Sequence, residues 1–262
     1  WQVSYVPHGI NPNVFKPLDI DLTETKNQLF GDKEYDFVLF YNSRNIRRKQ
    51  PSDVIMAFKE FCDKIGKDKA SKAVLLMHTT PRDDNGTDLP KVAETLAPDC
   101  NVVFSTAKLS TDQLNLLYNM ADCTVNIAGN EGFGLTTAES VMAGTPIIVN
   151  VTGGLQDQCG FRKDGKLLTA EDYIEIGSLH NWRDWEGKVT HGEWVRPVWS
   201  RAQTMAGSVP TPYIWDDKVD VYDVATAMMD MYNTPKEELI KNGKLGRESF
   251  IGESGLSVEN MC

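Results

Sequence analysis

The sequence predicts an α/β protein built on a doubly wound parallel sheet. Short apolar runs rich in β-branched residues recur between residues 36 and 150, and they suit strands buried on both faces. Segments with helical periodicity separate these runs. Polar or glycine-bearing loops follow several of the runs, which is where open α/β sheets place ligand contacts. This alternation favours right-handed crossover connections within a single sheet.

Each expected element follows from its local pattern. Residues 51–65 should form a helix because Val54, Ile55, Phe58 and Phe61 recur at helical spacing, and Pro51 suits a first turn. Ser110 is a suitable cap for the helix that follows it. The expected strands are 3–6, 36–42, 73–78, 101–104, 123–127 and 146–150, and the expected helices are 51–65, 89–96, 110–120, 135–143, 219–232 and 236–249.

Composition excludes several classes of protein. The formal charge of −10 over 262 residues disfavours nonspecific binding to nucleic acid or to an anionic membrane. No apolar run reaches membrane-spanning length and no signal peptide is visible. The five cysteines are scattered without CxxC spacing, which favours reduced thiols in a cytoplasmic protein, and the four histidines form no ligand cluster. We therefore expect no structural metal.

The most informative stretch is Ala128-Gly-Asn-Glu-Gly-Phe-Gly-Leu-Thr-Thr-Ala-Glu139, which lies between an expected strand and an expected helix. The first amides of a helix have no partner inside it, and the helix dipole places partial positive charge there, so this turn is suited to bind phosphate. Gly132 and Gly134 leave the backbone open to a ligand and permit positive φ. Glu131 lies in the loop and Glu139 lies more than a turn into the helix.

This stretch resembles the Glu-x7-Glu signature of retaining glycosyltransferases with the GT-B fold, family four, also called glycosyl transferases group 1. The resemblance includes Glu-Gly-Phe-Gly-Leu, a second glutamate eight positions after the first, Ala-Gly-Thr-Pro and a later Gly-Gly. Arg44 and Lys49 match the Arg-x4-Lys of the family, although Ser43 and Gln50 stand where glycine is usual. The segment 7–17 resembles the family's interdomain linker.

The resemblance implies roles for individual residues. Arg44 and Lys49 would neutralise the donor diphosphate, and Glu131 would hold hydroxyls of the donor sugar. Glu139 would bind the ribose hydroxyls, and Val103 to Ser105, at a strand end, would be candidates to hold the nucleobase. Backbone groups of the turn would line the sugar and phosphates, through Phe133, Gly134, Leu135 and Thr136. No cofactor or metal is expected beyond a UDP- or GDP-sugar as donor substrate.

The same resemblance divides the chain. Residues 1–20 would be a first strand and linker, and residues 21–262 would be a Rossmann-like donor-binding domain, with the acceptor domain absent from this chain. Any peripheral membrane contact would come only through that absent domain. Residues 155–218 hold five of the six tryptophans and read as an insertion. A small satellite core that pins a long loop is the favoured interpretation, and a sugar-stacking or protein-docking surface is the alternative.

The expected function is transfer of a hexose from a nucleotide sugar to a glycan, lipid or protein acceptor, with retention of anomeric configuration. Two alternatives stay open. One is a noncatalytic nucleotide-sugar or carbohydrate-binding module, and the other is a GT-B sugar-nucleotide epimerase. A Rossmann oxidoreductase is disfavoured because the glycine fingerprint and the ribose-binding acid about twenty residues later are missing.

Overall fold

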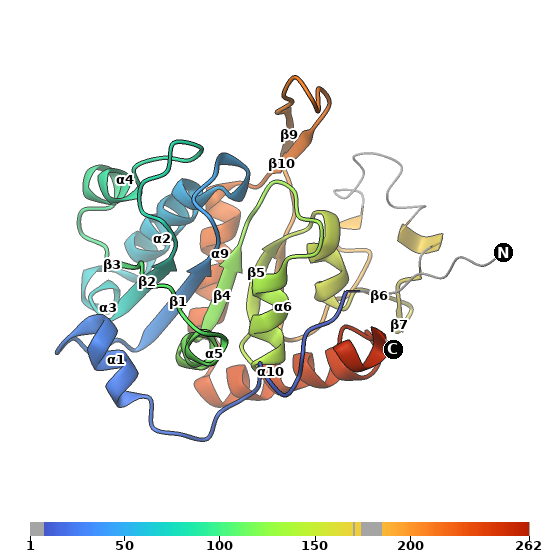
Figure 1. Cartoon of the computed structure of the whole chain (residues 1–262), viewed down its shortest axis with the longest axis horizontal. Helices are drawn as coiled ribbons and strands as arrows, with labels where there is room; N and C mark the ends of the chain where they lie inside the picture. The colour runs from blue at the N-terminus through green and yellow to red at the C-terminus, as the bar shows by residue number, and fades with distance from the viewer. Residues whose placement is uncertain (1–7, 170, 174–184, 262) are drawn as a thin grey trace.

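The computed structural model describes residues 8–169, 171–173 and 185–261. At its centre is a six-stranded sheet in the order β3-β2-β1-β4-β5-β8, and all neighbouring strands run parallel (Figure 1). The strands are β1 (Phe37–Asn42), β2 (Ala73–His78), β3 (Val102–Ser105), β4 (Cys123–Asn126), β5 (Ile147–Asn150) and β8 (Val195–Val198). The predicted doubly wound α/β fold is confirmed.

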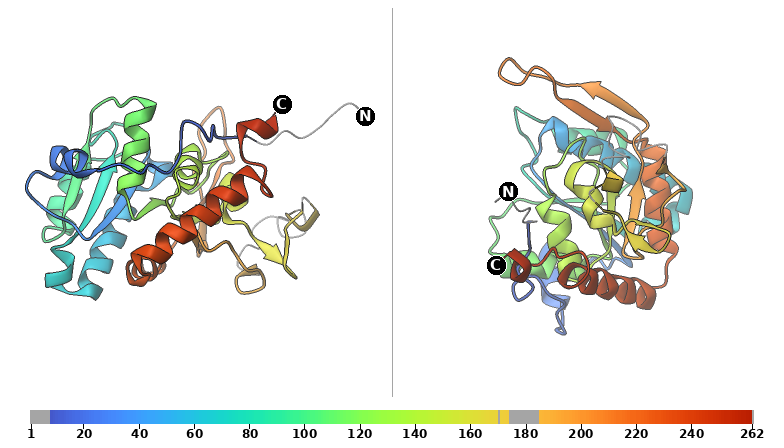
Figure 2. Two further views of the ribbon diagram at one scale, coloured as in Figure 1. Left: turned by 90° about the horizontal axis from the view of Figure 1, so that it is seen from below. Right: turned by 90° about the vertical axis from the view of Figure 1, so that its right-hand side faces the viewer.

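Helices cover both faces of the sheet, which explains why the strands are apolar throughout (Figures 1 and 2). In β1, Leu39 and Tyr41 pack into one core, whereas Val38 and Phe40 pack into the other. The first core is closed by α2 (Pro51–Ile65), α3 (Lys67–Ala70), α4 (Leu89–Leu96) and α9 (Val221–Asn233). The second is closed by α1 (Thr23–Phe30), α5 (Thr111–Met120), α6 (Leu135–Met142) and α10 (Lys236–Ile251).

Local signals predicted all of these helices except α1 and α3, which were not among the expected elements. Helix α2 has Pro51 in its first turn and buries Val54, Ile55, Phe58 and Phe61. Helix α5 begins with a capping box, in which Ser110 accepts from the Gln113 amide and the Gln113 side chain accepts from the Ser110 amide. The expected first strand at residues 3–6 lies outside the described residues.

The segment 155–218 is only partly an insertion. Its strand β8 pairs with β5 from Ile147↔Val195 to Asn150↔Val198, and it therefore belongs to the central sheet. The remainder includes two antiparallel pairs, β6 (Arg162–Lys163) with β7 (Lys166–Leu167), and β9 (Ala202–Met205) with β10 (Trp215–Lys218). The β9–β10 hairpin projects beyond the carboxyl end of the sheet (Figure 1). Short 3-10 helices lie at Arg47–Lys49 (η1), Gly153–Cys159 (η2) and Val258–Met261 (η3).

Two tryptophans of this segment belong to one of the two main cores and not to a separate satellite core. Trp194 and Trp199 are buried in the second core. A Cβ on Gly246 of α10 would lie 2.6 Å from Cγ of Trp194, so the small residue lets the indole pack directly on the helix. The Trp194 indole N–H donates to the Gln158 carbonyl at 3.0 Å, which satisfies its polar edge. Trp182 lies outside the described residues.

The described part of the predicted linker is held against the domain. Ile10 donates its amide to the Leu256 carbonyl at 2.9 Å and accepts from the Val258 amide at 3.1 Å. Arg247 of α10 donates to the carbonyls of Pro12 and Phe15, each at 2.8 Å, and also to that of Met142 at the end of α6. One guanidinium therefore joins the linker, α6 and α10.

Candidate active site

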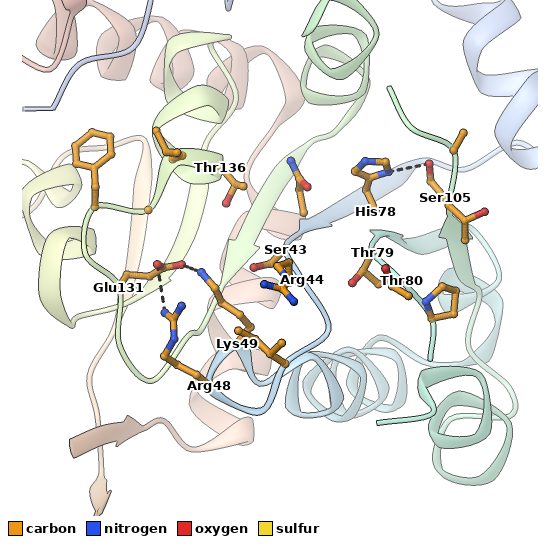
Figure 3. Close-up of a pocket in the computed structure, with 18 of the residues that line it drawn as sticks. Ser43, Arg44, Arg48, Lys49, His78, Thr79, Thr80, Ser105, Glu131 and Thr136 are labelled. Carbon is orange, nitrogen blue, oxygen red and sulfur yellow. Dashed lines mark hydrogen bonds and ion pairs between the residues drawn. The ribbon is translucent and has the colours of Figure 1, made fainter. Parts of the chain in front are cut away.

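A cavity of about 770 Å³ opens at the carboxyl ends of the central strands. It is lined by residues that follow β1, β2, β3 and β4, together with the start of α6 and His8 of the linker. Figure 3 shows Glu131, Arg48 and Lys49 together in one part of the cavity and His78 with Ser105 in another. Of the predicted site residues, Arg44, Lys49, Glu131, Phe133, Gly134, Leu135 and Thr136 line this cavity.

The predicted anion-binding turn is formed by Gly134, which precedes α6 with φ 86°. Its carbonyl accepts from Gln158 Nε2 at 3.0 Å, and the same amide group donates to the Phe133 carbonyl at 2.6 Å. The carbonyls of the turn are thus turned toward protein donors. The first amides of α6 keep their helix-terminal positive potential beside the cavity, because Gly134, Leu135 and Thr136 all line it.

A second glycine pair supports this loop from behind. The Gly154 amide donates to the Glu131 carbonyl at 2.9 Å. A Cβ on Gly154 would lie 2.4 Å from the Gly132 oxygen, and one on Gly153 would lie 2.0 Å from the Glu131 oxygen. Glycine is therefore required sterically at both positions. Gly132 could adopt a positive φ but does not, and a Cβ there would meet open space.

The basic loop after β1 brings two cations to one carboxylate. Lys49 Nζ and Glu131 Oε1 form an ion pair, and Arg48 Nη1 lies 3.5 Å from Glu131 Oε2. Asn126 Nδ2 also donates to Glu131 Oε1 at 3.3 Å. Burial lowers the pKa of Lys49, and the hydrogen bond and charge of Glu131 act in the opposite direction. Glu131 is 8% exposed, so these contacts fix its carboxylate at the cavity wall.

The loop geometry accounts for one departure from the family pattern. Gln50 adopts φ 51° and ψ 44°, the left-handed conformation that glycine reaches without strain. Its side-chain amide donates to the Asp217 carbonyl in β10 at 3.1 Å. The Asp217 amide donates in turn to the Gly129 carbonyl at 2.8 Å. Gln50 therefore ties the basic loop to the β9–β10 hairpin, and the Asp217 amide ties the signature loop (residues 128–134) to the same hairpin.

Glu139 does not line the cavity but lies behind it in a hydrogen-bonded chain. The Tyr118 hydroxyl donates to Glu139 Oε2 at 2.8 Å and accepts from Asn42 Nδ2 at 2.9 Å. Asn42 is a cavity residue at the end of β1. Burial raises the pKa of Glu139 to about 7, against the opposing effect of the Tyr118 hydrogen bond.

The ends of β2 and β3 form another part of the cavity. Of the nucleobase candidates Val103 to Ser105, Ser105 lines the cavity, whereas Val103 packs against the second core and is not among the cavity residues. His78, which the sequence did not place in the site, also lines it, and its Nδ1 lies 3.1 Å from Ser105 Oγ. Burial lowers the pKa of His78, so the neutral imidazole is favoured.

His8 contacts the signature loop from the linker. Its ring centroid lies 4.8 Å from that of Phe133, and both residues line the cavity. Within the described ranges, no group of three or more His, Cys, Asp or Glu residues is arranged to hold a metal ion. The described helices include none that is long and apolar enough to cross a membrane.

A parallel Rossmann-like sheet with a basic loop and a glycine turn at its carboxyl edge is the architecture of a GT-B glycosyltransferase domain. The family model for glycosyl transferases group 1 matches residues 23–177, more than half of the chain. The chain belongs to this family.

The curated relatives that the chain matches are named as glycosyltransferases. The chain is 26% identical over 187 residues to the D-inositol 3-phosphate glycosyltransferase of Corynebacterium jeikeium, covering 71% of this chain and 43% of that protein. It is 31% identical over 91 residues to the enzyme of the same name from Corynebacterium urealyticum, covering 34% of this chain and 22% of that protein. The chain thus spans less than half of the length of these relatives.

Solved structures show the fold. HepE from Anabaena, in complex with UDP and glucose, gives a TM-score of 0.64 at 13% identity, covering 98% of this chain and 53% of that one. Sucrose-phosphate synthase from Thermosynechococcus elongatus gives 0.62 at 18% identity, covering 98% and 49%. The C-terminal domain of a group 1 glycosyl transferase from Francisella tularensis gives 0.59 at 15% identity, covering 93% and 97%.

Proposed function

We propose that the protein transfers a hexose from a nucleotide diphosphate sugar to an acceptor hydroxyl with retention of anomeric configuration. We further propose that this chain is the donor-binding half of the enzyme and acts in the cytoplasm. The observation that carries the proposal is the convergence of Arg44, Lys49 and the first turn of α6 on one cavity. In a chain of formal charge −10, such a concentration of cations and unpaired amides is suited to a diphosphate.

In the proposed reaction the bond between the sugar C1 and the departing phosphate oxygen breaks, and a bond from the acceptor oxygen to C1 forms. The acceptor proton passes to an oxygen of the departing phosphate. Negative charge grows on the diphosphate during this step, so the fixed positive groups of Arg44, Lys49 and the α6 amides lower the barrier. Attack on the same face of the sugar as the leaving group gives retention.

Glu131 is proposed to hold hydroxyls of the donor sugar and to offset charge on its ring. A covalent mechanism would instead require its carboxylate to be a free nucleophile against the anomeric carbon. Both carboxylate oxygens already contact cations, with Lys49 at Oε1 and Arg48 at Oε2. This pairing favours a binding role over a nucleophilic one.

Glu139 is proposed to accept hydrogen bonds from the ribose hydroxyls, and the residues after β2 and β3 are proposed to contact the nucleobase. HepE was solved with UDP and glucose, which makes UDP-glucose a suitable first donor to test. A thermal-shift panel should compare UDP-, GDP- and ADP-sugars. At least one should raise the melting temperature, and Glu139→Gln should lower the calorimetric affinity for that donor. If no nucleotide sugar binds at millimolar concentration, the proposal is wrong.

A further inference from the structure

The Tyr118 side chain joins the cavity residue Asn42 to Glu139 through hydrogen bonds. It lies on α5 and is completely buried. Its hydroxyl accepts a hydrogen bond from Asn42 Nδ2 at 2.9 Å and donates one to Glu139 Oε2 at 2.8 Å. A phenolic hydroxyl has one proton to donate, and here that proton is directed to the carboxylate.

The tyrosine ring is held rigidly in this position. Phe15 of the linker and Phe40 of β1 both meet it edge-on, with ring centroids 5.9 Å and 5.4 Å from that of Tyr118. The Tyr118 carbonyl accepts from Thr145 Oγ1 at 2.7 Å. The hydroxyl is therefore a fixed point between two elements of the site. One is the carboxyl end of β1, where Asn42 lies. The other is α6, whose first residues line the cavity.

We propose that Tyr118 is a positioning residue of the donor site, whose hydroxyl orients the Glu139 carboxylate and the Asn42 amide for a nucleotide sugar. This inference rests on the proposed function, because it gives Glu139 the ribose. With one Glu139 oxygen fixed by Tyr118, the carboxylate cannot rotate away from the ligand, and its remaining lone pairs are free to accept sugar hydroxyls. Removing the hydroxyl would leave both the Asn42 donor and the Glu139 acceptor without their buried partner.

A tyrosine that only fills space at this point would behave differently. Tyr118→Phe preserves the ring and its edge contacts and removes only the hydroxyl. If packing were the whole role of the residue, this substitution would change stability but leave donor affinity as it was. If the hydroxyl positions Glu139, donor affinity should fall, and the fall should depend on whether Glu139 is present.

The experiment is a double-mutant cycle with Tyr118→Phe, Glu139→Gln and the double variant, titrated by calorimetry with UDP-glucose and, in parallel, GDP-mannose. We expect each single variant to bind the accepted donor about tenfold more weakly, and the double variant to bind no more than about threefold more weakly than the weaker single variant. Wild-type affinity in Tyr118→Phe, or a double variant whose loss is the product of the single losses, would overturn the proposal.

Tyr41 provides a matched comparison. It is also almost fully buried, but it packs into the first core on the opposite face of the sheet. Its hydroxyl donates to the Lys49 carbonyl at 3.4 Å and has no contact with Glu139 in the described structure. In a cycle of Tyr41→Phe with Glu139→Gln, the changes in donor affinity should therefore multiply. Coupling as strong as that of Tyr118 would contradict a specific role for the Tyr118 hydroxyl.

A ligand-free measurement separates this inference from the proposed function. Carboxyl NMR on the isotope-labelled chain can follow the titration of Glu139 in the wild type and in Tyr118→Phe. Loss of the donated hydrogen bond should raise the Glu139 pKa, because that bond favours the ionised form. An unchanged pKa would refute the positioning role. If the pKa rises but no nucleotide sugar binds to the wild type, the contact is real and the proposed function fails.

Discussion

At the scale of single residues, one buried carboxylate of the site is paired with two cationic side chains. The Glu131 carboxylate is in contact with both Lys49 and Arg48, so part of the positive charge near the cavity is already compensated. The Arg44 side chain has no hydrogen bond or ion pair within the described ranges and is exposed on the cavity wall. Arg44 is therefore the cation best able to move onto an incoming phosphate, whereas Lys49 is held in place.

Glu139 should make stability depend on pH in a specific direction. Its pKa is about 7 in the folded protein because it is buried, which is above the ordinary value of a glutamate. The folded state thus holds the proton more tightly than the unfolded state. The stability that this proton contributes is fully present below the unfolded-state pKa and is lost as pH rises through about 7. Ionisation of Glu139 without a ligand is therefore destabilising.

We predict that Glu139→Gln raises the free energy of unfolding at about pH 8 by about 1–3 kcal/mol and leaves it nearly unchanged at about pH 4, below the ordinary pKa of a glutamate. Glutamine keeps the shape and an oxygen that can accept from Tyr118, but it has no charge to bury. Urea unfolding of both proteins at the two pH values would measure the difference and cancel other titrating groups such as Asp157. An equal difference at both pH values would contradict the prediction.

The sequence predicted the residues of the signature and of the basic loop because their spacing is local and characteristic. It did not predict Tyr118, Asn42 or His78, although all three belong to the site or its support. The Tyr118 hydroxyl bonds to Asn42 across 76 positions and to Glu139 across 21, and no periodicity links such distant residues. For a related reason the sequence located the strand end, Val103 to Ser105, but could not tell which of these residues faces the cavity.

At the scale of elements, the signature loop keeps its shape because a second loop packs against it. A Cβ on Gly154 would lie 2.5 Å from Cα of Phe133 and 2.4 Å from the Gly132 oxygen. These are backbone atoms, so the clash can be relieved only by moving the loop that carries Glu131 and Phe133. The strand-loop-helix of the signature and the glycine pair after β5 therefore function as one unit.

We predict that Gly154→Ala weakens binding of the accepted nucleotide sugar at least tenfold, because it displaces the anion-binding turn. Gly132→Ala is the matched control in the same loop. A Cβ at that position would meet nothing within 4 Å, so it should change affinity less than threefold and leave the melting temperature unaltered. Calorimetry and thermal unfolding of both variants provide the test. Equal effects of the two substitutions would show that the close packing is unimportant.

The sequence predicted a helix or strand correctly where the pattern within that segment determined it. It missed a strand that forms only by pairing with a distant strand. Helix α2 and strand β2 have the bounds expected from their periodicity. Strand β8 is four residues long and contains Pro197, which reads as a break in sequence but is tolerated at an edge of the sheet. β8 is a strand of the central sheet because it pairs with β5, some fifty positions earlier in the chain. The surrounding Gly, Pro and Trp residues form no pattern from which this pairing could be predicted.

At the scale of the whole molecule, the hairpin and the sheet meet at Asp217. Its carboxylate accepts from Thr152 Oγ1 at 2.7 Å and from Gln203 Nε2 at 2.6 Å. Its backbone binds Gly129 and Gln50 on the two loops of the site. The hairpin is thus anchored at the rim of the cavity by several hydrogen bonds, so the geometry of the basic loop depends on a segment about 170 positions away.

A comparison of two arginines can separate a direct contact in the site from the long-range effect of the chain's net negative charge. Arg44 and Arg47 lie in the same loop after β1, but only Arg44 lines the main cavity. Replacing either by alanine removes one positive charge from a chain of formal charge −10, so the long-range effect on an anionic donor is similar for both. In the proposed site, only the loss of Arg44 removes a hydrogen-bond donor from the cavity that would hold the diphosphate.

We predict that Arg44→Ala slows release of nucleotide diphosphate from the accepted nucleotide sugar by about 100-fold or more, with a smaller loss of donor affinity. The reason is that the arginine is proposed to stabilise mainly the negative charge that develops as the bond breaks. Arg47→Ala should change the same rate less than threefold. The rates can be followed by nucleotide release at low and high salt. Because added salt screens distant charges but not a direct contact, the difference between the two variants should persist at high salt. If the two variants slow the reaction equally and salt removes the effect, Arg44 contributes only to the general field of the protein and does not contact the diphosphate.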